Sequence, residues 1–338
     1  MIKEAISIIV SGSSLSSAEA RDVMKEIMQG QATPAQIGAF LTALRMKGET
    51  TDEIAGFAQA MRESAIAVKP KRNQLVDTCG TGGDGKSTFN ISTTVAFVAA
   101  GAGLAVAKHG NRSVSSKCGS ADLLQALGVN LELTSEQVAQ CIDEVGIGFL
   151  FAPRFHPAMK HALGPRQEIG LRTIFNILGP LSNPAQAKRQ LLGVYDADLT
   201  KTIAEVLNAL GSDEAYVVHG ADGLDELSTT GKNKVSHLRN SRIVTFHLDP
   251  QELGLPQASL SDLSGGTVED NVRITKAILK GELGPKRDVV LLNAAAVLIV
   301  GGKASSFNEG LKLAAESIDS GNPQRKLEQL VEFSQSFK

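Results

Sequence analysis

The sequence predicts an α/β fold in two parts. The first is a small all-helical N-terminal domain at 1–69, and the second is a large α/β domain at 74–338 whose central, mostly parallel sheet is flanked by helices. Apolar residues keep a helical period up to about Ile66. Beyond a polar linker at 67–73, short apolar runs alternate with helical patterns, which favours a mostly parallel sheet covered by helices. A chain of 338 residues is also long for one hydrophobic core.

Helix starts in the first part carry capping-box spacing. In such a box a Ser or Thr side chain and a Glu or Gln three residues later satisfy free backbone N–H groups. The pairs are Ser16 and Glu19, Thr33 and Gln36, and Thr50 and Glu53. Pro34 stands where a first helical residue belongs, and Gly30 and Gly48 stand where helices should end. We therefore expect a compact unit of helices at the start of the chain.

The second part contains short apolar segments suited to a sheet. Strands are expected near 75–76, 104–107, 146–151, 191–194, 215–218 and 243–246. Helices are expected from about Ser92 to Gly101 and from about Ser120, and the apolar run 289–300 indicates a buried helix or strand. Functional loops in such sheets lie beyond the carboxyl ends of the strands. The loops that follow the first two strands are therefore the first candidates for a site.

Composition and charge exclude several classes of function. The net charge is −2, with 36 acidic and 34 basic residues, so we expect no general binding to nucleic acid or to an anionic membrane. The run 289–300 is too short to span a bilayer, which takes about 20 residues. The three cysteines are far apart and form no metal-binding pattern, and the first residues carry no secretory apolar core. A reduced, cytoplasmic protein is expected.

Three loops rich in small, hydrogen-bonding residues dominate the sequence between 80 and 113. They read Gly-Thr-Gly-Gly-Asp at 80–84, Thr-Phe-Asn-Ile-Ser-Thr at 88–93 and Lys-His-Gly-Asn-Arg-Ser at 108–113. Glycine lets a backbone approach a ligand closely, and hydroxyls together with free N–H groups suit phosphate oxygens. A buried phosphate also requires cations or many donors, and the third loop offers both. The sequence therefore predicts a site for a phosphorylated small molecule.

The segment 80–87 also fits two general nucleotide-binding patterns, the Walker A spacing and G-x-G-x-x-G, but neither has its expected context. A dinucleotide site needs an acidic residue about 20 positions later, where this chain has Lys108 and His109. A P-loop opens its helix at the Lys-Ser pair, whereas the helix signal here begins near Ser92. On pattern alone, a tight strand-to-helix turn and a solvated basic loop stay open as alternatives.

Charged residues outside these loops add three further candidates. Asp225 and Glu226 follow an apolar strand and a Gly turn; they suit Mg²⁺ together with phosphate oxygens, or form a surface turn. Arg166 and Arg172 suit bidentate capture of a carboxylate, or structural ion pairs. His109 is assigned only proximity to a ligand, because a lone histidine is more often structural than catalytic.

Taken together, four motifs in order along the chain resemble those of the anthranilate phosphoribosyltransferase family. They are Asp-x-x-Gly-Thr-Gly-Gly-Asp-Gly at 77–85, Thr-Phe-Asn-Ile-Ser-Thr at 88–93, Lys-His-Gly-Asn-Arg at 108–112 and Arg-Thr-Ile-Phe-Asn-x-Leu-Gly-Pro-Leu at 172–181. The resemblance covers nearly the whole chain. It implies a helical domain joined by a helical segment near 155–185, a homodimer formed through that domain, and two Mg²⁺ ions per monomer. The implied reaction transfers the phosphoribosyl group of 5-phosphoribosyl 1-diphosphate (PRPP) to anthranilate in tryptophan biosynthesis.

The resemblance also implies a role for individual residues, matched motif by motif. PRPP would be bound by Gly80, Gly83, Asp84, Thr88, Asn90, Ile91, Ser92, Thr93, Lys108, His109, Gly110, Asn111, Arg112, Ser113, Val114, Ser115, Ser116 and Ser120, the loop 108–116 closing over the phosphates. Anthranilate would be held by Gly80, Asn111 and Arg166, and the metal by Ser92, Asp225 and Glu226. Small departures from the family pattern are Cys118 in place of Ser, Gln125 in place of Glu, and the Gly-Pro pair at 164–165.

The expected chemistry needs no acid, base or nucleophile from the protein. The amine of anthranilate is neutral near physiological pH, so positioning and electrostatic stabilisation of the diphosphate leaving group carry the reaction. Three alternatives remain: a pyrimidine nucleoside phosphorylase, whose Ser-Gly-Arg-Gly-type loop is missing here, a P-loop nucleotidase, and a non-catalytic relative that binds nucleic acid.

Overall fold

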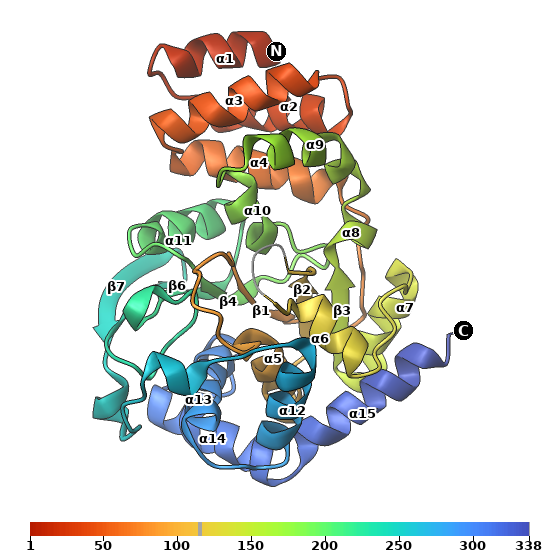
Figure 1. Ribbon diagram of the computed structural model, residues 1–338, viewed down its shortest axis with the longest axis vertical. Helices are drawn as coiled ribbons and strands as arrows, with labels where there is room; N and C mark the ends of the chain where they lie inside the picture. Colours follow the sequence, from red (N-terminus) through yellow and green to blue (C-terminus); the bar gives the residue numbers. More distant parts are fainter. Residues whose placement is uncertain (114–116, 338) are drawn as a thin grey trace.

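The computed structural model describes residues 1–113 and 117–337, and its helical N-terminal part lies at one end of the molecule (Figure 1). This part consists of α1 (Ile2–Val10), α2 (Ser17–Met28), α3 (Pro34–Lys47) and α4 (Thr51–Ser64). All three predicted capping boxes are formed, so α2, α3 and α4 begin where the sequence placed them. Phe40 and Phe57 meet edge to face in its core, with ring centroids 5.8 Å apart.

Later helices return to this helical part. The connecting helices are α8 (Ala152–Phe155), α9 (Lys160–Ile169) and α10 (Phe175–Leu181). Helix α9 packs against α2 and α3, and α10 packs against α4. Gly30 makes room for this contact, because a Cβ there would fall 2.6 Å from the ring of His161. The domain boundaries 1–69 and 74–338 stay predictions. The helical part includes α9 and α10 as well as the first four helices.

A seven-stranded sheet in the order β3-β2-β1-β4-β5-β6-β7 forms the centre of the second part. The strands are β1 (Val76–Gly80), β2 (Val106–Gly110), β3 (Ile147–Phe151), β4 (Arg189–Gly193), β5 (Glu214–His219), β6 (Asn233–Arg239) and β7 (Arg242–Leu248). The first five are mutually parallel, β6 pairs antiparallel with β5, and β7 pairs antiparallel with β6. The mostly parallel sheet is therefore confirmed. Strand β6 was not predicted from the sequence, because its polar residues alternate with only a few apolar ones.

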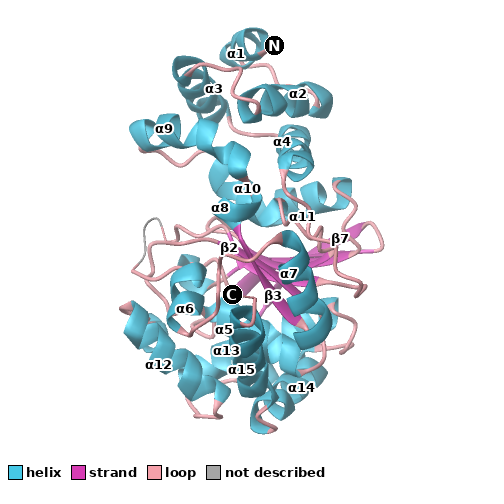
Figure 2. Ribbon diagram, turned by 90° about the vertical axis from the view of Figure 1, so that its right-hand side faces the viewer, coloured by secondary structure: helices cyan, strands magenta, loops and turns pink. Residues whose placement is uncertain are grey.

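Helices cover both faces of this sheet (Figure 2). They are α5 (Ile91–Gly101), α6 (Ser120–Ala126), α7 (Ser135–Gln140), α11 (Leu199–Ala209), α12 (Val268–Leu279), α13 (Pro285–Val300), α14 (Phe307–Asp319) and α15 (Asn322–Gln335). Helix α5 packs on β1 and β2, and α13 packs on α5 and β4. The apolar run 289–300 is thus a buried helix. In the described part of the chain, no helix is long and apolar enough to cross a membrane.

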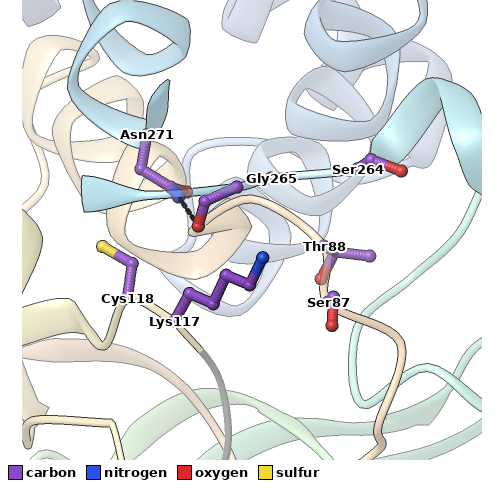
Figure 3. A pocket seen from close by; sticks show the side chains of 8 residues that line it. Ser87, Thr88, Lys117, Cys118, Ser264, Gly265 and Asn271 are labelled. Carbon is purple, nitrogen blue, oxygen red and sulfur yellow. Dashed lines mark hydrogen bonds between the residues drawn. The ribbon is translucent and has the colours of Figure 1, made fainter. Parts of the chain in front are cut away.

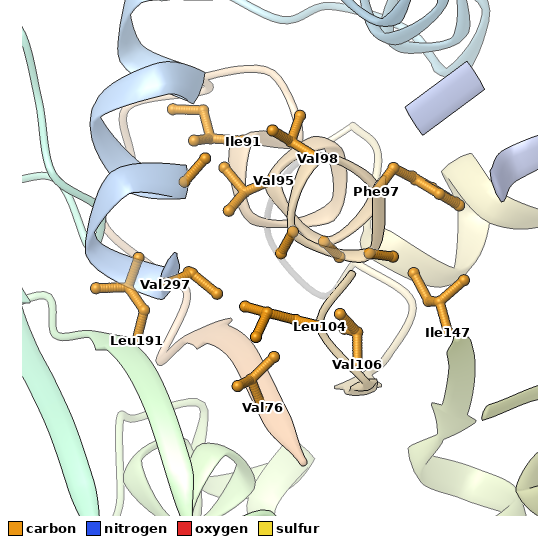
Figure 4. Packing of buried hydrophobic residues seen from close by; sticks show 14 of the residues in the cluster. Val76, Ile91, Val95, Phe97, Val98, Leu104, Val106, Ile147, Leu191 and Val297 are labelled. Carbon is orange, nitrogen blue, oxygen red and sulfur yellow. The ribbon is translucent and has the colours of Figure 1, made fainter. Parts of the chain in front are cut away.

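The core between α5 and the sheet determines where α5 begins. Val95 of α5 lies in one apolar cluster with Val106 of β2 and Val297 of α13, whereas Val98 lies on the side of α5 turned away from the strands (Figure 4). Burial of this apolar face fixes the helix against the sheet. Its first turn therefore lies at the carboxyl ends of β1 and β2.

Candidate active site

The glycine-rich loop after β1 lies against Asp225 from the loop after β5. Gly80 of β1 and Gly193 of β4 are paired across the sheet, and Asp225 sits over both. A Cβ on Gly80 would come 2.9 Å from the carboxyl carbon of Asp225, and a Cβ on Gly193 would overlap the Asp225 carbonyl. The backbone N–H of Gly82 donates to the Asp225 carboxylate at 2.6 Å. Glycine is required at these strand ends because the acidic loop approaches so closely.

Asp225 and Glu226 lie, partly buried, at the same sheet edge as the glycine-rich loop, rather than in a remote surface turn. Burial, followed by the negative charge of Asp84, raises the pKa of Asp225 to about 7. Burial, followed by the charge of Asp225, raises the pKa of Glu226 to about 8. Carboxylates this close together, with little positive charge nearby, repel one another. A bound divalent cation would reduce that repulsion.

The first turn of α5 faces these carboxylates. The N–H of Ser92 donates to Glu226 Oε1 at 3.3 Å, and its carbonyl accepts from the Thr78 hydroxyl at 2.9 Å. The buried Thr93 hydroxyl has no hydrogen-bond partner among the described residues. As expected, the helix begins at Ile91 and not at the Lys-Ser pair of 86–87, so the segment is not a P-loop. A helix start with free donors is a ready anion site.

Lys108 is buried inside the sheet edge. The prediction that 108–116 is wholly a loop is wrong for its first three residues, because pairing with β3 extends β2 through Gly110. The Lys108 ammonium donates to the Thr78 carbonyl at 2.6 Å and to the Ser92 hydroxyl at 3.3 Å. Burial lowers its pKa, while the charge of Asp77 acts in the opposite direction. Lys108 therefore holds β1 and α5 together next to the predicted phosphate site.

Asp77 and Asn183 were not predicted as site residues, yet they support the end of β2. The buried Asp77 carboxylate accepts from the His109 N–H at 3.2 Å and from the Asn183 side chain at 2.7 Å. Asn183 also donates to the Ala107 carbonyl at 2.8 Å. The sequence does contain a signal for this support: Asp77 is an acidic residue inside an apolar strand, and the neighbouring strand carries Lys108.

Two buried histidines line the side of the site nearest α10. His109 Nδ1 lies 3.1 Å from the Gly179 carbonyl, and burial lowers the pKa of His109 to about 3. His156, which sequence reasoning missed, lies with its ring centroid 5.2 Å from that of His109, and burial lowers its pKa to about 4. Among the described residues, Nε2 of each ring has no partner. Both rings are neutral near pH 7 and present an unused polar atom.

The segment after β2 turns back onto α6. Arg112 donates at 2.8 Å to both Asp122 and Gln125, so in this structure its guanidinium is turned toward α6. The Asn111 carbonyl accepts from the Ser120 hydroxyl at 3.2 Å. The N–H of Ser113 donates to the Asp122 carboxylate at 3.1 Å. Three further predicted PRPP residues lie outside the described part of the chain: Val114, Ser115 and Ser116.

Both candidate arginines are stacked on aromatic rings. Arg166 of α9 lies over the ring of Phe175 at 5.0 Å, and burial lowers its pKa. Arg172, between α9 and α10, lies over the ring of Tyr195 at 4.5 Å. Neither arginine forms an ion pair with a carboxylate anywhere in residues 1–113 and 117–337. The alternative of structural ion pairs therefore does not apply to them here.

A pocket of about 190 Å³ adjoins the second loop (Figure 3). It is lined by Ser87, Thr88, Lys117, Cys118, Ser264, Gly265, Gly266 and Asn271. Asn271 accepts from the Asn90 N–H at 3.0 Å, so helix α12, which the sequence did not single out, supports this loop. Burial raises the pKa of the Cys118 thiol to about 11, and its sulfur lies 3.2 Å from Asn90 Oδ1. The thiol thus takes part in packing at this departure from the family pattern.

The chain matches family models and curated proteins along its length. A model described as the glycosyl transferase family, helical bundle domain, matches residues 3–65, and one described as its a/b domain matches residues 72–324. Anthranilate phosphoribosyltransferase of Moorella thermoacetica is 59% identical over 337 residues, which cover 100% of this chain and 99% of that protein. The corresponding protein of Acetivibrio thermocellus is 56% identical over 337 residues, covering 100% of this chain and 98% of that protein.

Solved structures show the same fold. Anthranilate phosphoribosyltransferase from Thermus thermophilus superposes with a TM-score of 0.94 at 45% identity, covering 98% of this chain and 99% of that one. The Saccharomyces cerevisiae protein, solved with PRPP and Mg, gives a TM-score of 0.91 at 32% identity, covering 99% of this chain and 98% of that one. The resemblance read from the four motifs is thereby confirmed. The chain belongs to the anthranilate phosphoribosyltransferase family of glycosyl transferases.

Proposed function

We propose that this chain transfers the phosphoribosyl group of PRPP to the amine of anthranilate, which yields N-(5-phosphoribosyl)anthranilate and diphosphate for tryptophan biosynthesis. One observation carries the proposal. The glycine-rich loop, the first turn of α5 and the Asp225–Glu226 pair converge at one edge of the sheet. Backbone N–H groups at a helix start, with acidic side chains beside them, suit a phosphate group that arrives with a divalent cation.

PRPP is expected at this edge. Its diphosphate and ribose would contact the glycine-rich loop and the residues from Thr88 to Thr93, where the Thr93 hydroxyl is available as a donor. The Lys108 ammonium supplies positive charge next to this site, because it donates to the Ser92 hydroxyl. The described residues from Asn111 to Ser113, with Ser120, would close over the phosphates. That closure would require Arg112 to exchange its contacts with α6 for contacts with substrate.

Mg²⁺ fits the residues present. No cluster of three or more His, Cys, Asp or Glu side chains forms a complete metal site within the described ranges. Asp225, Glu226 and the Ser92 hydroxyl therefore leave positions for phosphate oxygens and water, as Mg²⁺ prefers. When bound, the cation would neutralise charge on the diphosphate leaving group. The relative from Saccharomyces cerevisiae was solved with PRPP and Mg, and the expected number of two ions per monomer stays a proposal.

Anthranilate is expected between Arg166 and the glycine-rich loop. The Arg166 guanidinium has no carboxylate partner in the described part of the chain, and a partly buried arginine of this kind suits a substrate carboxylate. Gly80 and Asn111 would complete the subsite. A Saccharomyces cerevisiae relative was solved with 4-fluoroanthranilate. The neighbouring Phe175 ring offers an apolar surface beside Arg166.

Catalysis in this arrangement would come from positioning. Departure of diphosphate leaves an oxocarbenium-like anomeric carbon, and the neutral amine of anthranilate attacks it. The nitrogen of the new C–N bond then loses one proton to water or to the departing diphosphate. Holding two substrates in line supplies about 7–11 kcal/mol of the barrier in favourable cases. The buried histidines are neutral at pH 7 because burial lowers their pKa values to about 3 and about 4, so neither carries a proton to deliver.

Dimerisation through the helical part is supported by exposed apolar side chains on its outer helices. Val10 at the end of α1 is 70% exposed and Met46 near the end of α3 is 83% exposed. Light scattering during gel filtration should report twice the chain mass of 35.5 kDa, and Met46→Glu should shift the protein toward the monomer.

The decisive experiment mixes the protein with Mg²⁺, anthranilate and PRPP and follows loss of anthranilate fluorescence. Turnover that disappears with EDTA and returns with Mg²⁺ supports the proposal. Thymidine and uridine with inorganic phosphate serve as the test for a nucleoside phosphorylase. Phosphorolysis of these nucleosides without anthranilate turnover would replace the proposed function.

A further inference from the structure

Arg172 approaches the glycine-rich loop from the helical side of the site. It lies between α9 and α10, the helices that return to the N-terminal part of the molecule. Its Nη2 atom is 3.1 Å, and its Nε atom 3.5 Å, from the position that a Cβ on Gly83 would occupy. Gly83 has a φ of +74°, a left-handed conformation that favours glycine, and a Cβ there would crowd this guanidinium. The flat side of the guanidinium therefore lies against the turn of the loop.

Tyr195 fixes this position from the other side. The carbon at the centre of the Arg172 guanidinium lies 4.5 Å from the centroid of the Tyr195 ring. The Tyr195 N–H donates to the Thr81 hydroxyl at 3.1 Å, and the Thr81 N–H donates to the Gly193 carbonyl at 2.9 Å. The ring is thus tied to the same loop. A cation stacked in this way loses little further freedom when it binds an anion.

The charge of Arg172 is not neutralised by the protein within the described residues. It forms neither an ion pair nor a hydrogen bond there, although it is largely exposed. Two other cations near the site are already bound within the protein. Lys108 binds Thr78 and Ser92, and Arg112 binds Asp122. Arg172 is therefore a cation beside this loop whose N–H groups are available to a ligand.

We propose that Arg172 binds the diphosphate group of PRPP at the outer side of the glycine-rich loop, which places one PRPP contact on the segment that carries Arg166. The inference rests on the proposed function. A planar guanidinium can give two parallel hydrogen bonds to phosphate oxygens, and this geometry is unavailable to lysine. The contact would connect the helical side of the site to PRPP. In this arrangement Arg172 binds PRPP, whereas Arg166 binds anthranilate.

The test compares Arg172→Gln and Arg172→Lys with a charge-matched control, Arg273→Gln, an exposed residue of α12 outside the site. Steady-state kinetics give the KM for each substrate, and calorimetry measures binding of magnesium diphosphate. Arg172→Gln should raise the KM for PRPP and the Kd for magnesium diphosphate about 5- to 50-fold, because charge-assisted hydrogen bonds are lost. The KM for anthranilate should stay within about twofold, and the defect should shrink at high salt.

The remaining variants separate binding from a structural role. Arg172→Lys should recover part of the lost binding, since it keeps the positive charge but not the two parallel N–H donors. Arg273→Gln should match wild type. An unchanged KM for PRPP and an unchanged Kd for magnesium diphosphate in Arg172→Gln would overturn the inference. A lowered melting temperature with equal rises in both KM values would also overturn it, in favour of a structural role. If wild type lacks transferase activity, the proposed function fails, and the calorimetry still decides the role of Arg172.

Discussion

The close approach of Asp225 to the strand ends can be tested at Gly193. A Cβ added at this position would overlap the carbonyl of Asp225, well inside the 3.0 Å below which real Cβ atoms essentially never approach another atom. The obstacle is backbone on both sides, since Gly193 is in β4, so no flexible side chain can yield. The Asp225 loop must therefore retreat by about an ångström, a misplacement that costs on the order of 100-fold in rate when it affects reacting groups.

Gly193→Ala should accordingly lower kcat about 100-fold and raise the Mg²⁺ concentration needed for half-maximal activity. Gly38→Ala is the matched control: it adds the same methyl group on α3, where nothing lies within 4 Å of the new Cβ. The assay is anthranilate fluorescence over a Mg²⁺ titration, with melting temperatures for both variants. Wild-type kcat and wild-type Mg²⁺ dependence in a folded Gly193→Ala protein would refute the reasoning.

Three further predictions follow from the site. Arg166→Ala should raise the KM for anthranilate about 10- to 100-fold, with the KM for PRPP nearly unchanged in the same kinetics, because a charge-assisted contact to the carboxylate is lost. Asp225→Asn and Glu226→Gln should each reduce Mg²⁺-dependent turnover at least about 10-fold while the melting temperature without metal stays level or rises; full turnover at wild-type Mg²⁺ would remove their assignment. Finally, the folded pKa values of about 7 and about 8 lie above the ordinary values of 3.8 and 4.5. Bound protons therefore stabilise the metal-free fold fully below about pH 4, and this stabilisation is lost as the pH rises through about 8. The melting temperature in EDTA should fall over this range, and magnesium diphosphate should raise it more at pH 8.5 than at pH 6.

Local sequence signals predicted the elements that depend on neighbouring residues. The capping boxes at Ser16, Thr33 and Thr50 set three helix starts, because a side chain three residues away satisfies the free backbone donors. The helix after the second loop begins at Ile91, one residue before the predicted Ser92. The family and its reaction were also readable from four ordered motifs, and both are confirmed by the relatives.

Contacts between distant segments were beyond the sequence. The sequence placed Lys108 in a basic loop at the phosphate site, but pairing of β2 with β3 extends the strand through this residue, which is buried. β6 was missed because its burial comes from pairing with β5 rather than from its own composition. His156 and Asn183 lie at the site only because the folded chain brings the segments on either side of α10 next to the sheet.

The amino-acid sequence alone determined the helical N-terminal unit, the strand–helix alternation and the loops that carry phosphate chemistry, since each depends on residues a few positions apart. Tertiary structure decided how these loops meet. Gly82 and Asp225 are 143 residues apart, and their hydrogen bond exists because parallel pairing of β1, β4 and β5 brings the strand ends to one edge. Register and burial, which are properties of the whole sheet, thus turn separate motifs into one site.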